Sequence, residues 1–298
     1  MDAAIELTGL TKTYGERTVV DLDLTVERGE LLAILGPNGA GKTTATEICE
    51  GYRRPTTGTV RVLGEDPMQA GQAWRSRIGI VTQETGAFDR LTAREALGHL
   101  AGFYPDPLDI DEALALVDLI EQRDQKVDEL SGGQRRRLDL ACGIIGQPEL
   151  LFLDEPTTGL DPEVRRRLWG IVDDLRRHSV TIVLTTHYLE EAEALADRVA
   201  VIDGGRLVAL DTPERLGGRD HDGVVVSFLT PPGFTEHPIS LDADPADGDR
   251  TSIRTTTPTA LIARLHTDLG AELDELTVTR PSLEDVYLRL VSTERVPS

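Results

Sequence analysis

The sequence predicts an α/β fold in which helices flank a mixed sheet, with an antiparallel β subdomain and a helical insert. Apolar runs of strand length, such as residues 31–35 and 150–153, alternate with longer segments of helical periodicity. Runs without polar positions are typical of parallel strands buried on both faces. Toward the C-terminus the pattern changes, which predicts a small α+β domain. We expect domains at residues 1–215 and 216–298, with the helical subdomain at about 84–150.

The chain has 298 residues, enough for one large domain and a smaller one. Its longest apolar runs are about five residues, whereas a membrane-spanning helix needs roughly 18. The acidic N-terminus has no apolar core, so we expect no secretory signal. Cys49 and Cys142 lie in segments of helical periodicity without metal-ligand spacing, which predicts two buried free thiols in a reducing compartment.

The formal net charge is −21, and lysine occurs only at positions 12, 42 and 126. Nucleic-acid phosphates attract Lys and Arg, so the acidic composition argues against a nucleic-acid partner. Two explanations of the acidic, arginine-carrying composition stay open. One is adaptation to high salt, and the other is the residue bias of a GC-rich genome.

The first predicted elements are strands at residues 5–11 and 18–26, which open the β subdomain. Tyr14 lies in the turn between them. An aromatic ring ahead of a phosphate-binding loop can stack on a nucleotide base. A half-exposed turn tyrosine is the alternative.

The next strand and helix enclose a complete G-x-x-x-x-G-K-[ST] motif. Its glycines allow a tight turn that directs backbone N–H groups at a phosphate, and the helix start adds partial positive charge. Lys42 supplies a cation for the β- and γ-phosphates, and the Thr43 hydroxyl can complete a Mg²⁺ shell. A turn that binds nothing would not require Lys and Thr in this register. The predicted nucleotide-binding residues are Gly36, Pro37, Asn38, Gly39, Ala40, Gly41, Lys42, Thr43 and Thr44.

Gln83 ends a predicted strand at residues 77–83, where a parallel sheet presents groups to a ligand. A polar strand end without a ligand is the other interpretation. The helical insert follows, with a capping-box pattern at residues 92–95 and helical apolar spacing at residues 109–119.

The segment Leu130-Ser131-Gly132-Gly133-Gln134 precedes a predicted helix at residues 135–145. Ser131 and Gln134 have the spacing of a second capping box. The two glycines allow close approach to the N–H groups at the helix start, where an anion would bind well. A capped helix that only packs is the alternative.

Two carboxylates, Asp154 and Glu155, follow the apolar run at residues 150–153. Adjacent carboxylates at the end of a buried strand are costly unless a cation lies beside them. Mg²⁺ on a triphosphate would be that cation, with Asp154 at the metal and Glu155 placed to take a proton from water. Two solvated carboxylates are the alternative.

Asp161 lies in a turn before a predicted helix that begins at Pro162. A strand at residues 180–185 then leads to His187. We expect His187 on the same sheet edge as Gln83, where it can bond a γ-phosphate. A histidine at a helix start can also be a capping or surface residue.

Together these segments resemble the nucleotide-binding subunit of an ABC transporter over residues 4–215, which implies a P-loop NTPase core. Residues 130–134 match the LSGGQ signature of that family without substitution, and this pentapeptide separates the family from other P-loop NTPases. Residues 150–155 are similar to its Walker B strand with the catalytic glutamate. By position, its Q-loop glutamine, D-loop aspartate, switch histidine and adenine-stacking aromatic are similar to Gln83, Asp161, His187 and Tyr14.

The resemblance implies an ATPase that works as a head-to-tail dimer, with the phosphate loop of one subunit facing the signature helix of its mate across a shared ATP. Because the chain has one set of motifs, it needs a second copy or a paralogous ATPase subunit. The implied catalytic residues are Glu155, His187, Lys42 and Gln83. The implied Mg²⁺ ligands are Thr43, Gln83 and Asp154. The mate would contribute Ser131 and Gly133 to the same ATP. The implied nucleotide-binding residues also include Gly132, Gln134 and Asp161.

Residues 280–287 resemble the C-terminal end of daunorubicin-resistance exporter subunits, which implies export of a drug, lipid or polysaccharide. The chain would then be cytoplasmic, peripheral on the inner face of the cell membrane, and bound to a multi-spanning permease subunit. Two rival functions stay open: a soluble ABC ATPase acting in DNA repair or translation, and an unrelated P-loop kinase or GTPase. The acidic charge and the single ATPase copy disfavour the soluble ABC ATPase. A kinase or GTPase would leave the signature helix without a function.

Overall fold

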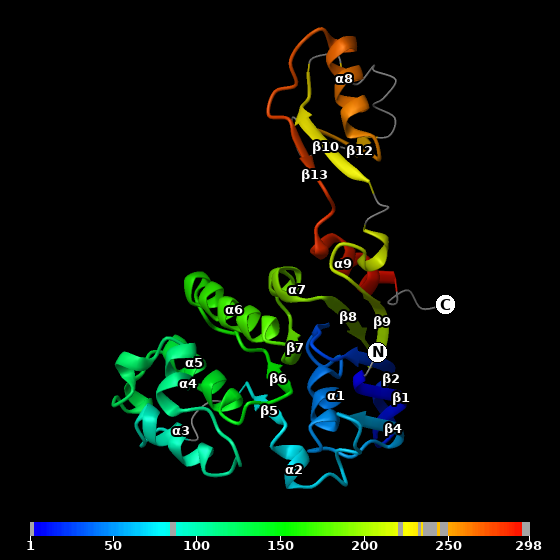
Figure 1. Cartoon of the computed structure of the whole chain (residues 1–298). Coiled ribbons are helices and arrows are strands. Elements are labelled where there is room, and N and C mark those ends of the chain that lie inside the picture. Colours follow the sequence, from blue (N-terminus) through cyan, green and yellow to red (C-terminus); the bar gives the residue numbers. More distant parts are fainter. Residues whose placement is uncertain are drawn as a thin grey trace. The chain divides into compact units, whose positions relative to one another are not determined.

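The structure is a computed structural model, and it describes residues 3–83, 88–219, 223–231, 234, 243–244 and 250–293 (Figure 1). The chain divides into two compact units, Met1–Pro213 and Glu214–Ser298, called unit 1 and unit 2 below. The domain boundary that the sequence places after residue 215 stays a prediction. Within the described ranges, every helix is too short or too polar to span a bilayer.

Unit 1 is built on one mixed sheet with the strand order β4-β1-β2-β9-β8-β3-β7-β6-β5. Strands β5, β6, β7, β3 and β8 run parallel, and β1, β2 and β4 form the antiparallel part. The predicted α/β fold with an antiparallel β subdomain is therefore confirmed. The strands are β1 (Ala3–Tyr14), β2 (Arg17–Glu27), β3 (Leu31–Leu35), β4 (Thr57–Val62), β5 (Ile78–Val81), β6 (Leu150–Asp154), β7 (Thr181–Thr186), β8 (Arg198–Asp203) and β9 (Arg206–Asp211).

The central strands are buried on both faces, which explains their uninterrupted apolar sequences. Along β6, Phe152 joins one apolar cluster and its neighbours Leu151 and Leu153 join another. The first cluster contains the apolar face of α1 (Lys42–Cys49), and the second contains those of α5 (Gly132–Ile144) and α6 (Pro162–Arg177). The sheet thus has helices on both faces, and its strand ends are held between two packed layers.

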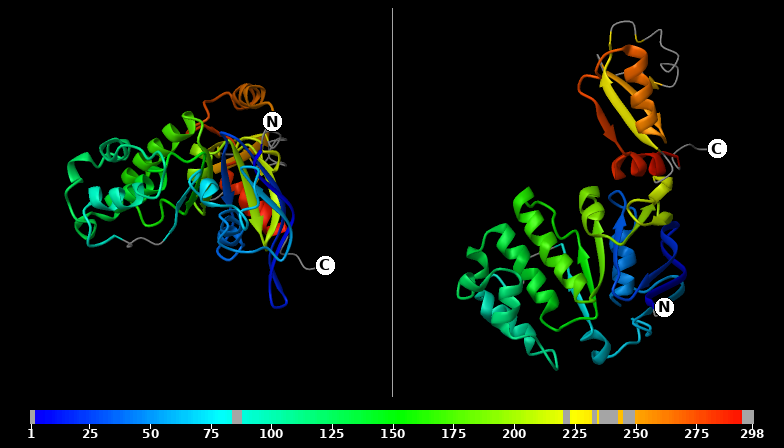
Figure 2. Two further views of the ribbon diagram at one scale, coloured as in Figure 1. Left: turned by 60° about the horizontal axis from the view of Figure 1, so that its bottom comes forward. Right: turned by 45° about the horizontal axis from the view of Figure 1, so that its top comes forward.

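The helical insert consists mainly of α3 (Ala93–Ala101), α4 (Ile110–Leu116) and α5, which lie together on the β5 side of the sheet, away from β1, β2 and β4 (Figures 1 and 2). Both predicted capping boxes are present, at Thr92 and at Ser131. The sequence did not predict α2 (Gln72–Arg75), because one helical turn is too short to show a period. The remaining helices of unit 1 are α7 (Leu189–Leu195), η1 (Ile120–Gln122) and η2 (Val127–Glu129).

Unit 2 has its own antiparallel sheet in the order β11-β12-β10-β13 and its own apolar core around Phe228 and Phe234. The rings of these two residues meet edge to face with centroids 5.3 Å apart. This confirms the predicted small α+β domain. Its elements are β10 (Val224–Leu229), β11 (Ala243–Asp244), β12 (Arg250–Thr255), β13 (Thr277–Thr279), α8 (Pro258–Leu269), α9 (Leu283–Thr293) and η3 (Leu216–Gly218).

The two cysteines are free thiols on α1 and α5, as the sequence predicts. Cys49 is buried and Cys142 is half-buried. Burial raises the pKa of each thiol to about 12. Both side chains therefore act as small apolar core residues and are poorly reactive.

Candidate functional site

The loop between β3 and α1 forms a cradle that only glycine can build at two positions. A Cβ on Gly36 would lie 2.2 Å from the Ile202 carbonyl oxygen, and one on Gly41 would lie 2.3 Å from that of Val19. Gly41 also has a φ of 102°, which side-chain-bearing residues rarely adopt. The loop opens onto a cavity of about 320 Å³ whose lining includes Asn38, Gly39, Ala40, Gly41, Lys42, Thr43, Thr44, Gln83 and Glu155.

Lys42 is only 6% exposed at the bottom of this cradle. Its Nζ donates hydrogen bonds to the carbonyl oxygens of Gly36 at 2.7 Å and Pro37 at 3.3 Å. Glu155 Oε1 lies 4.0 Å away. Burial lowers the pKa of Lys42, and the nearby Glu155 and Asp154 oppose that shift. A buried ammonium with two neutral partners and one distant carboxylate can still gain a great deal from a phosphate.

The carboxyl ends of β5, β6 and β7 meet at the edge of the sheet beside the cradle, because these strands pair in parallel. Gln83 lies two residues beyond β5, Asp154 ends β6, and His187 directly follows β7. The Thr185 hydroxyl donates a hydrogen bond to Asp154 Oδ1. A second cavity of about 760 Å³ is lined by Thr43, Gln83 and Asp154.

These three side chains offer a hydroxyl, an amide and a carboxylate oxygen, a donor set that suits the hard cation Mg²⁺. Within the described ranges, no group of three or more His, Cys, Asp and Glu side chains is arranged to hold a metal. Magnesium usually takes one or two carboxylates plus substrate phosphates rather than a complete protein cage. The residues present therefore fit a Mg²⁺ ion that shares a nucleotide's phosphates.

Glu155 is held in a strained backbone conformation, with φ at 46°. Its N–H donates to the carbonyl oxygen of Thr185 at 3.0 Å and to that residue's hydroxyl at 3.2 Å. The Thr158 hydroxyl donates to Glu155 Oε2 at 3.2 Å, and His187 Nδ1 lies 3.3 Å from the same oxygen. The carboxylate is 14% exposed and faces both Lys42 and His187, which is a suitable position for a general base.

The signature segment forms the N-terminus of α5. The Ser131 N–H donates to Gln134 Oε1 at 2.8 Å, and the Gln134 N–H donates to Ser131 Oγ at 3.3 Å. Ser131 Oγ thus accepts a bond within its helix, and its O–H remains able to donate to a ligand. A Cβ on Gly133 would lie 2.6 Å from Val164 Cγ1, whereas Gly132 has open space beside it. The described linings of the two cavities do not include this segment.

Tyr14 and Asp161 also lie outside those described linings. Tyr14 is the last residue of β1 and is 44% exposed. Its hydroxyl accepts a bond from Arg53 at 2.5 Å, and Lys12 Nζ lies 5.1 Å from the ring centroid. Asp161 caps α6, with its Oδ1 accepting bonds from two N–H groups of the first turn. Their predicted contacts with a nucleotide stay predictions.

Three residues that hydrogen-bond to Asp154 or Glu155 are not apparent from the sequence: Thr158, Thr185 and Arg136. Thr185 is a fully buried hydroxyl at the end of an apolar strand, and that polar position was the available signal. Arg136 lies in a run of three arginines, which is typical of a solvated helix face, yet it is 6% exposed. Three consecutive arginines do not show which of them is buried. That depends on backbone carbonyl acceptors at the edge of the sheet, which come from other segments of the chain.

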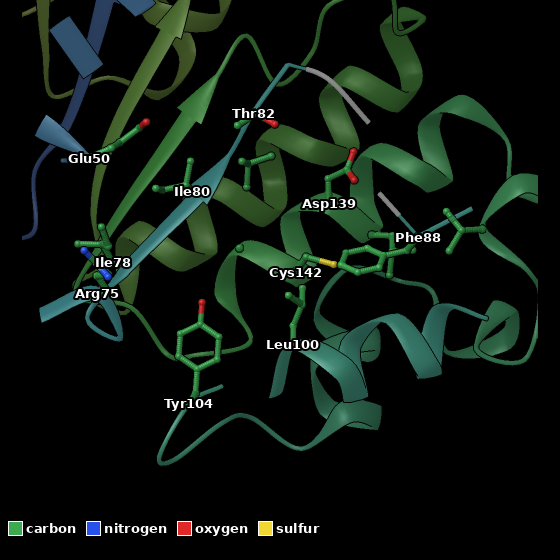
Figure 3. A pocket seen from close by; sticks show the side chains of 14 residues that line it. Glu50, Arg75, Ile78, Ile80, Thr82, Phe88, Leu100, Tyr104, Asp139 and Cys142 are labelled. Carbon is green, nitrogen blue, oxygen red and sulfur yellow. The ribbon is translucent and has the colours of Figure 1, made fainter. Parts of the chain in front are cut away.

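A further cavity of about 390 Å³ lies between β5 and the helical insert (Figure 3). Ile80, Tyr104 and Cys142 supply part of its apolar lining, and Asp139 and Glu50 supply carboxyl groups. Burial, opposed by Arg136, raises the pKa of Asp139 to about 6. Burial, with smaller contributions from Asp154 and Glu47, raises the pKa of Glu50 to about 7. The lining of this cavity is more apolar than that of the cavity at the neighbouring strand ends.

Comparisons with known proteins find chains of similar sequence and similar fold. A family model described as ABC transporter matches residues 19–158. A daunorubicin resistance ATP-binding protein of Streptomyces coeruleorubidus is 37% identical over 99% of this chain and 98% of its own length. The Nod factor export ATP-binding protein I of Sinorhizobium fredii is 38% identical over 98% of this chain and 87% of its own. A dimeric ATP-binding cassette solved in a post-hydrolysis state with ADP and Pi has a TM-score of 0.63 at 25% identity, covering 70% of this chain and 98% of that one.

Proposed function

The chain belongs to the ABC transporter family as an ATP-binding, ATP-hydrolysing subunit, and we propose that it powers an exporter as half of a head-to-tail ATPase dimer. The relatives that align over nearly the full chain are resistance and export proteins. They support neither the DNA repair or translation alternative nor an unrelated kinase or GTPase.

One observation carries the site assignment: Glu155 Oε1 lies 4.0 Å from Lys42 Nζ, at the junction of the phosphate cradle and the strand ends. A triphosphate in the cradle would place its γ-phosphate between these two groups. Lys42 would then exchange its carbonyl partners for phosphate oxygens. Glu155 would orient a water molecule and take its proton, while His187 would hold a γ-phosphate oxygen.

A bound Mg²⁺ would neutralise charge that develops on the phosphates, and Thr43, Gln83 and Asp154 are the residues that would hold it. Thr185 supports this arrangement, because its hydroxyl donates a hydrogen bond to Asp154 Oδ1, and Asp154 lines the cavity of about 760 Å³. Gln83 lines that cavity and the cradle together, so it can respond to both metal and phosphate.

The position of the signature segment supports the dimer, because this segment is not part of the described lining of the cradle in its own chain. Ser131 and Gly133 form an anion-binding helix start outside the described lining of their own chain's cradle. In a two-fold dimer the same helix start would close over the partner's nucleotide, together with Tyr14 from the cradle side. Gln134 would serve indirectly, since its side chain caps Ser131, and Asp161 would hold the start of α6. A homodimer is the simpler assembly, and a paralogous subunit is the alternative.

Transport requires a membrane subunit, since the described helices do not span a bilayer. We propose a multi-spanning permease partner, with the chain peripheral on the cytoplasmic face of the cell membrane. The helical insert would transmit dimer closure to that partner. The relatives are named for daunorubicin resistance and Nod factor export, so a drug, lipid or polysaccharide is the proposed cargo class.

The test is Glu155→Gln, which keeps the side chain's shape and removes the general base. We expect ATP hydrolysis to fall by about 10³-fold or more, and an ATP-bound dimer to accumulate on size exclusion with light scattering. Glu121→Gln in the exposed η1 is the matched control and should behave as wild type. Wild-type turnover in Glu155→Gln would refute the base assignment. A monomer with ATP, even with its membrane partner present, would refute the shared site.

A further inference from the structure

Arg136 lies one turn after the start of α5, with its guanidinium buried under the catalytic edge of the sheet. Its Nη1 lies 3.7 Å from Asp139 Oδ2 on the same helix. It donates four hydrogen bonds to backbone carbonyls, one just after β5 and three at the end of β6 and just beyond it. These acceptors are Thr82 O at 2.6 Å, Pro156 O at 2.7 Å, Asp154 O at 2.9 Å and Glu155 O at 3.1 Å. One side chain therefore bridges the signature helix, the segment before Gln83 and the segment that carries Glu155.

The position of these carbonyls determines where the reactive side chains point. Glu155 has φ at 46°, a conformation that its surroundings must maintain. Thr185 holds the N–H of Glu155, and Arg136 holds its carbonyl and that of Pro156. Arg136 also holds the carbonyl of Thr82, whose peptide leads directly into Gln83.

We propose that Arg136 is a positioning residue for ATP hydrolysis, which fixes the strained backbone of Glu155 and the approach to Gln83 by binding both segments at once. This inference rests on the proposed role of Glu155 as general base. Arg136 does not belong to the described lining of the cradle, so it acts through the carboxylate and not on the nucleotide.

To hold four carbonyl oxygens at once, the side chain at this position must be the guanidinium of an arginine. A guanidinium offers five N–H donors in one plane, which can reach acceptors in several directions, whereas a lysine ammonium offers three donors on a single atom. At this buried position a lysine cannot bond all four carbonyls, and Glu155 is then free to leave its strained conformation. Displacement of a reacting group by about 1 Å can cost about 100-fold in rate.

The adjacent Arg137 provides a matched control. It is 7% exposed on the same helix, and its Nη1 donates to the carbonyl oxygens of Val117 at 2.8 Å and Asp118 at 2.6 Å. These acceptors lie in the helical insert, away from the catalytic edge. Replacement of either arginine removes a buried guanidinium and its backbone contacts, but only one replacement releases Glu155.

The experiment compares Arg136→Lys with Arg137→Lys in the full-length chain, by steady-state ATPase kinetics, ATP affinity and melting temperature. We expect Arg136→Lys to lower kcat by about 10- to 100-fold, with KM and ATP affinity within about threefold of wild type. Arg137→Lys should keep kcat within about threefold. Equal losses of kcat in the two variants, or a loss confined to ATP affinity, would overturn the inference.

A second measurement separates positioning from general support of the fold. Tens of millimolar methylguanidinium should raise kcat of Arg136→Ala at least several-fold and leave that of Arg137→Ala unchanged, because only one vacated site faces Glu155. Absence of selective rescue would contradict the positioning role. If wild-type enzyme hydrolyses ATP and Glu155→Gln does not, while Arg136→Lys keeps its rate, this inference alone fails and the proposed function stands.

Discussion

Lys42 and Glu155 are the two residues that the proposed function uses most directly, and backbone hydrogen bonds help to hold each of them. Lys42 has carbonyl oxygens as its near partners, and Glu155 is fixed through its N–H, its carbonyl and one hydroxyl. Their own separation of 4.0 Å is too long for a strong ion pair. Both groups therefore keep interaction capacity for a substrate that can lie between them.

Lys42→Ala tests the first of these residues. We expect ATP affinity to fall by about 10- to 100-fold, because a charge-assisted hydrogen bond to phosphate contributes roughly 1.5–3 kcal/mol. Lys126→Ala is a matched control in the exposed part of the helical insert and should bind ATP as wild type. Equilibrium titration with a fluorescent ATP analogue measures both, and unchanged affinity in Lys42→Ala would contradict its assigned role.

At the residue scale, the sequence predicts contiguous motifs well and distributed contacts poorly. The phosphate loop is predictable because its glycines, lysine and threonine occupy one short segment with a fixed register. Arg136 is not predictable, because its four acceptors come from two other segments of the chain. Which arginine of residues 135–137 reaches them depends on how α5 rotates against the sheet.

At the scale of single elements, α3 and α5 begin with equivalent capping boxes, and only the second has a proposed ligand. In α3 the Thr92 hydroxyl accepts from the Glu95 N–H, and in α5 the Ser131 hydroxyl accepts from the Gln134 N–H. Loss of either cap removes the same kind of bond from a helix start. The two helices thus form a natural pair of test and control.

Ser131→Ala and Thr92→Ala should each cost about 1 kcal/mol of stability, measured by denaturant unfolding. Only Ser131→Ala should also slow ATP hydrolysis and weaken the ATP-induced dimer, because only that hydroxyl would contact the partner's nucleotide. Equal ATPase rates in the two variants would mean that the serine serves its own helix alone.

The carboxyl group of Glu50, at the C-terminal end of α1, makes the stability of the folded state depend on pH. Glu50 follows Cys49, and burial raises its pKa from 4.5 to about 7. A raised carboxyl pKa means that the folded state binds the proton more tightly than the unfolded chain. The folded state is therefore penalised as pH rises from about 4.5 to 7, and the full penalty persists above that range.

Glu50→Gln should remove this penalty. Relative to wild type, we expect the variant to be more stable by on the order of 2 kcal/mol at pH 8, with the difference shrinking as pH falls toward 5. Exposed Glu16→Gln is the control and should show no such trend. Urea unfolding at several pH values measures the difference, and a constant difference across pH would show that Glu50 does not titrate as described.

Element type and order were predicted correctly for the long, strongly patterned segments, and the ends of elements less well. The helix expected at residues 109–119 is α4, Ile110–Leu116, followed by a short 3-10 turn. The strand expected to reach Gln83 ends at Val81. In the strand the pattern continues past Val81, the last residue that pairs with β6. In the helix it continues past Leu116, although Asp118 has φ at 56°, which is incompatible with a right-handed helix.

At the scale of the whole molecule, the net charge of −21 sets a repulsion that acts on every part of the chain. Screening shortens the reach of this repulsion from about 30 Å at 0.01 M salt to about 3 Å at 1 M. If the composition is an adaptation to high salt, the melting temperature should rise by several degrees between dilute buffer and molar KCl. A melting temperature that is equal in both would favour the residue-bias explanation.

The division into two units also belongs to this scale. Every predicted site residue lies in unit 1, whereas unit 2 has a separate sheet and core. The change of pattern near residue 216 was visible in the sequence, because short strands and a Gly-Gly step replace the long alternating segments. The function of unit 2 could not be predicted from the sequence. Its pattern of apolar residues indicates a packed core, and its sequence contains no cluster of reactive residues.

The two native thiols have a practical consequence. With pKa values of about 12, roughly one molecule in 10⁵ carries a thiolate at either position at pH 7, so maleimide reagents should largely ignore both. Wild-type protein is therefore a ready background for spectroscopic labelling. A cysteine introduced at Asp124, whose side chain is 76% exposed, would accept a spin or fluorescent probe on the helical insert and report its displacement during turnover.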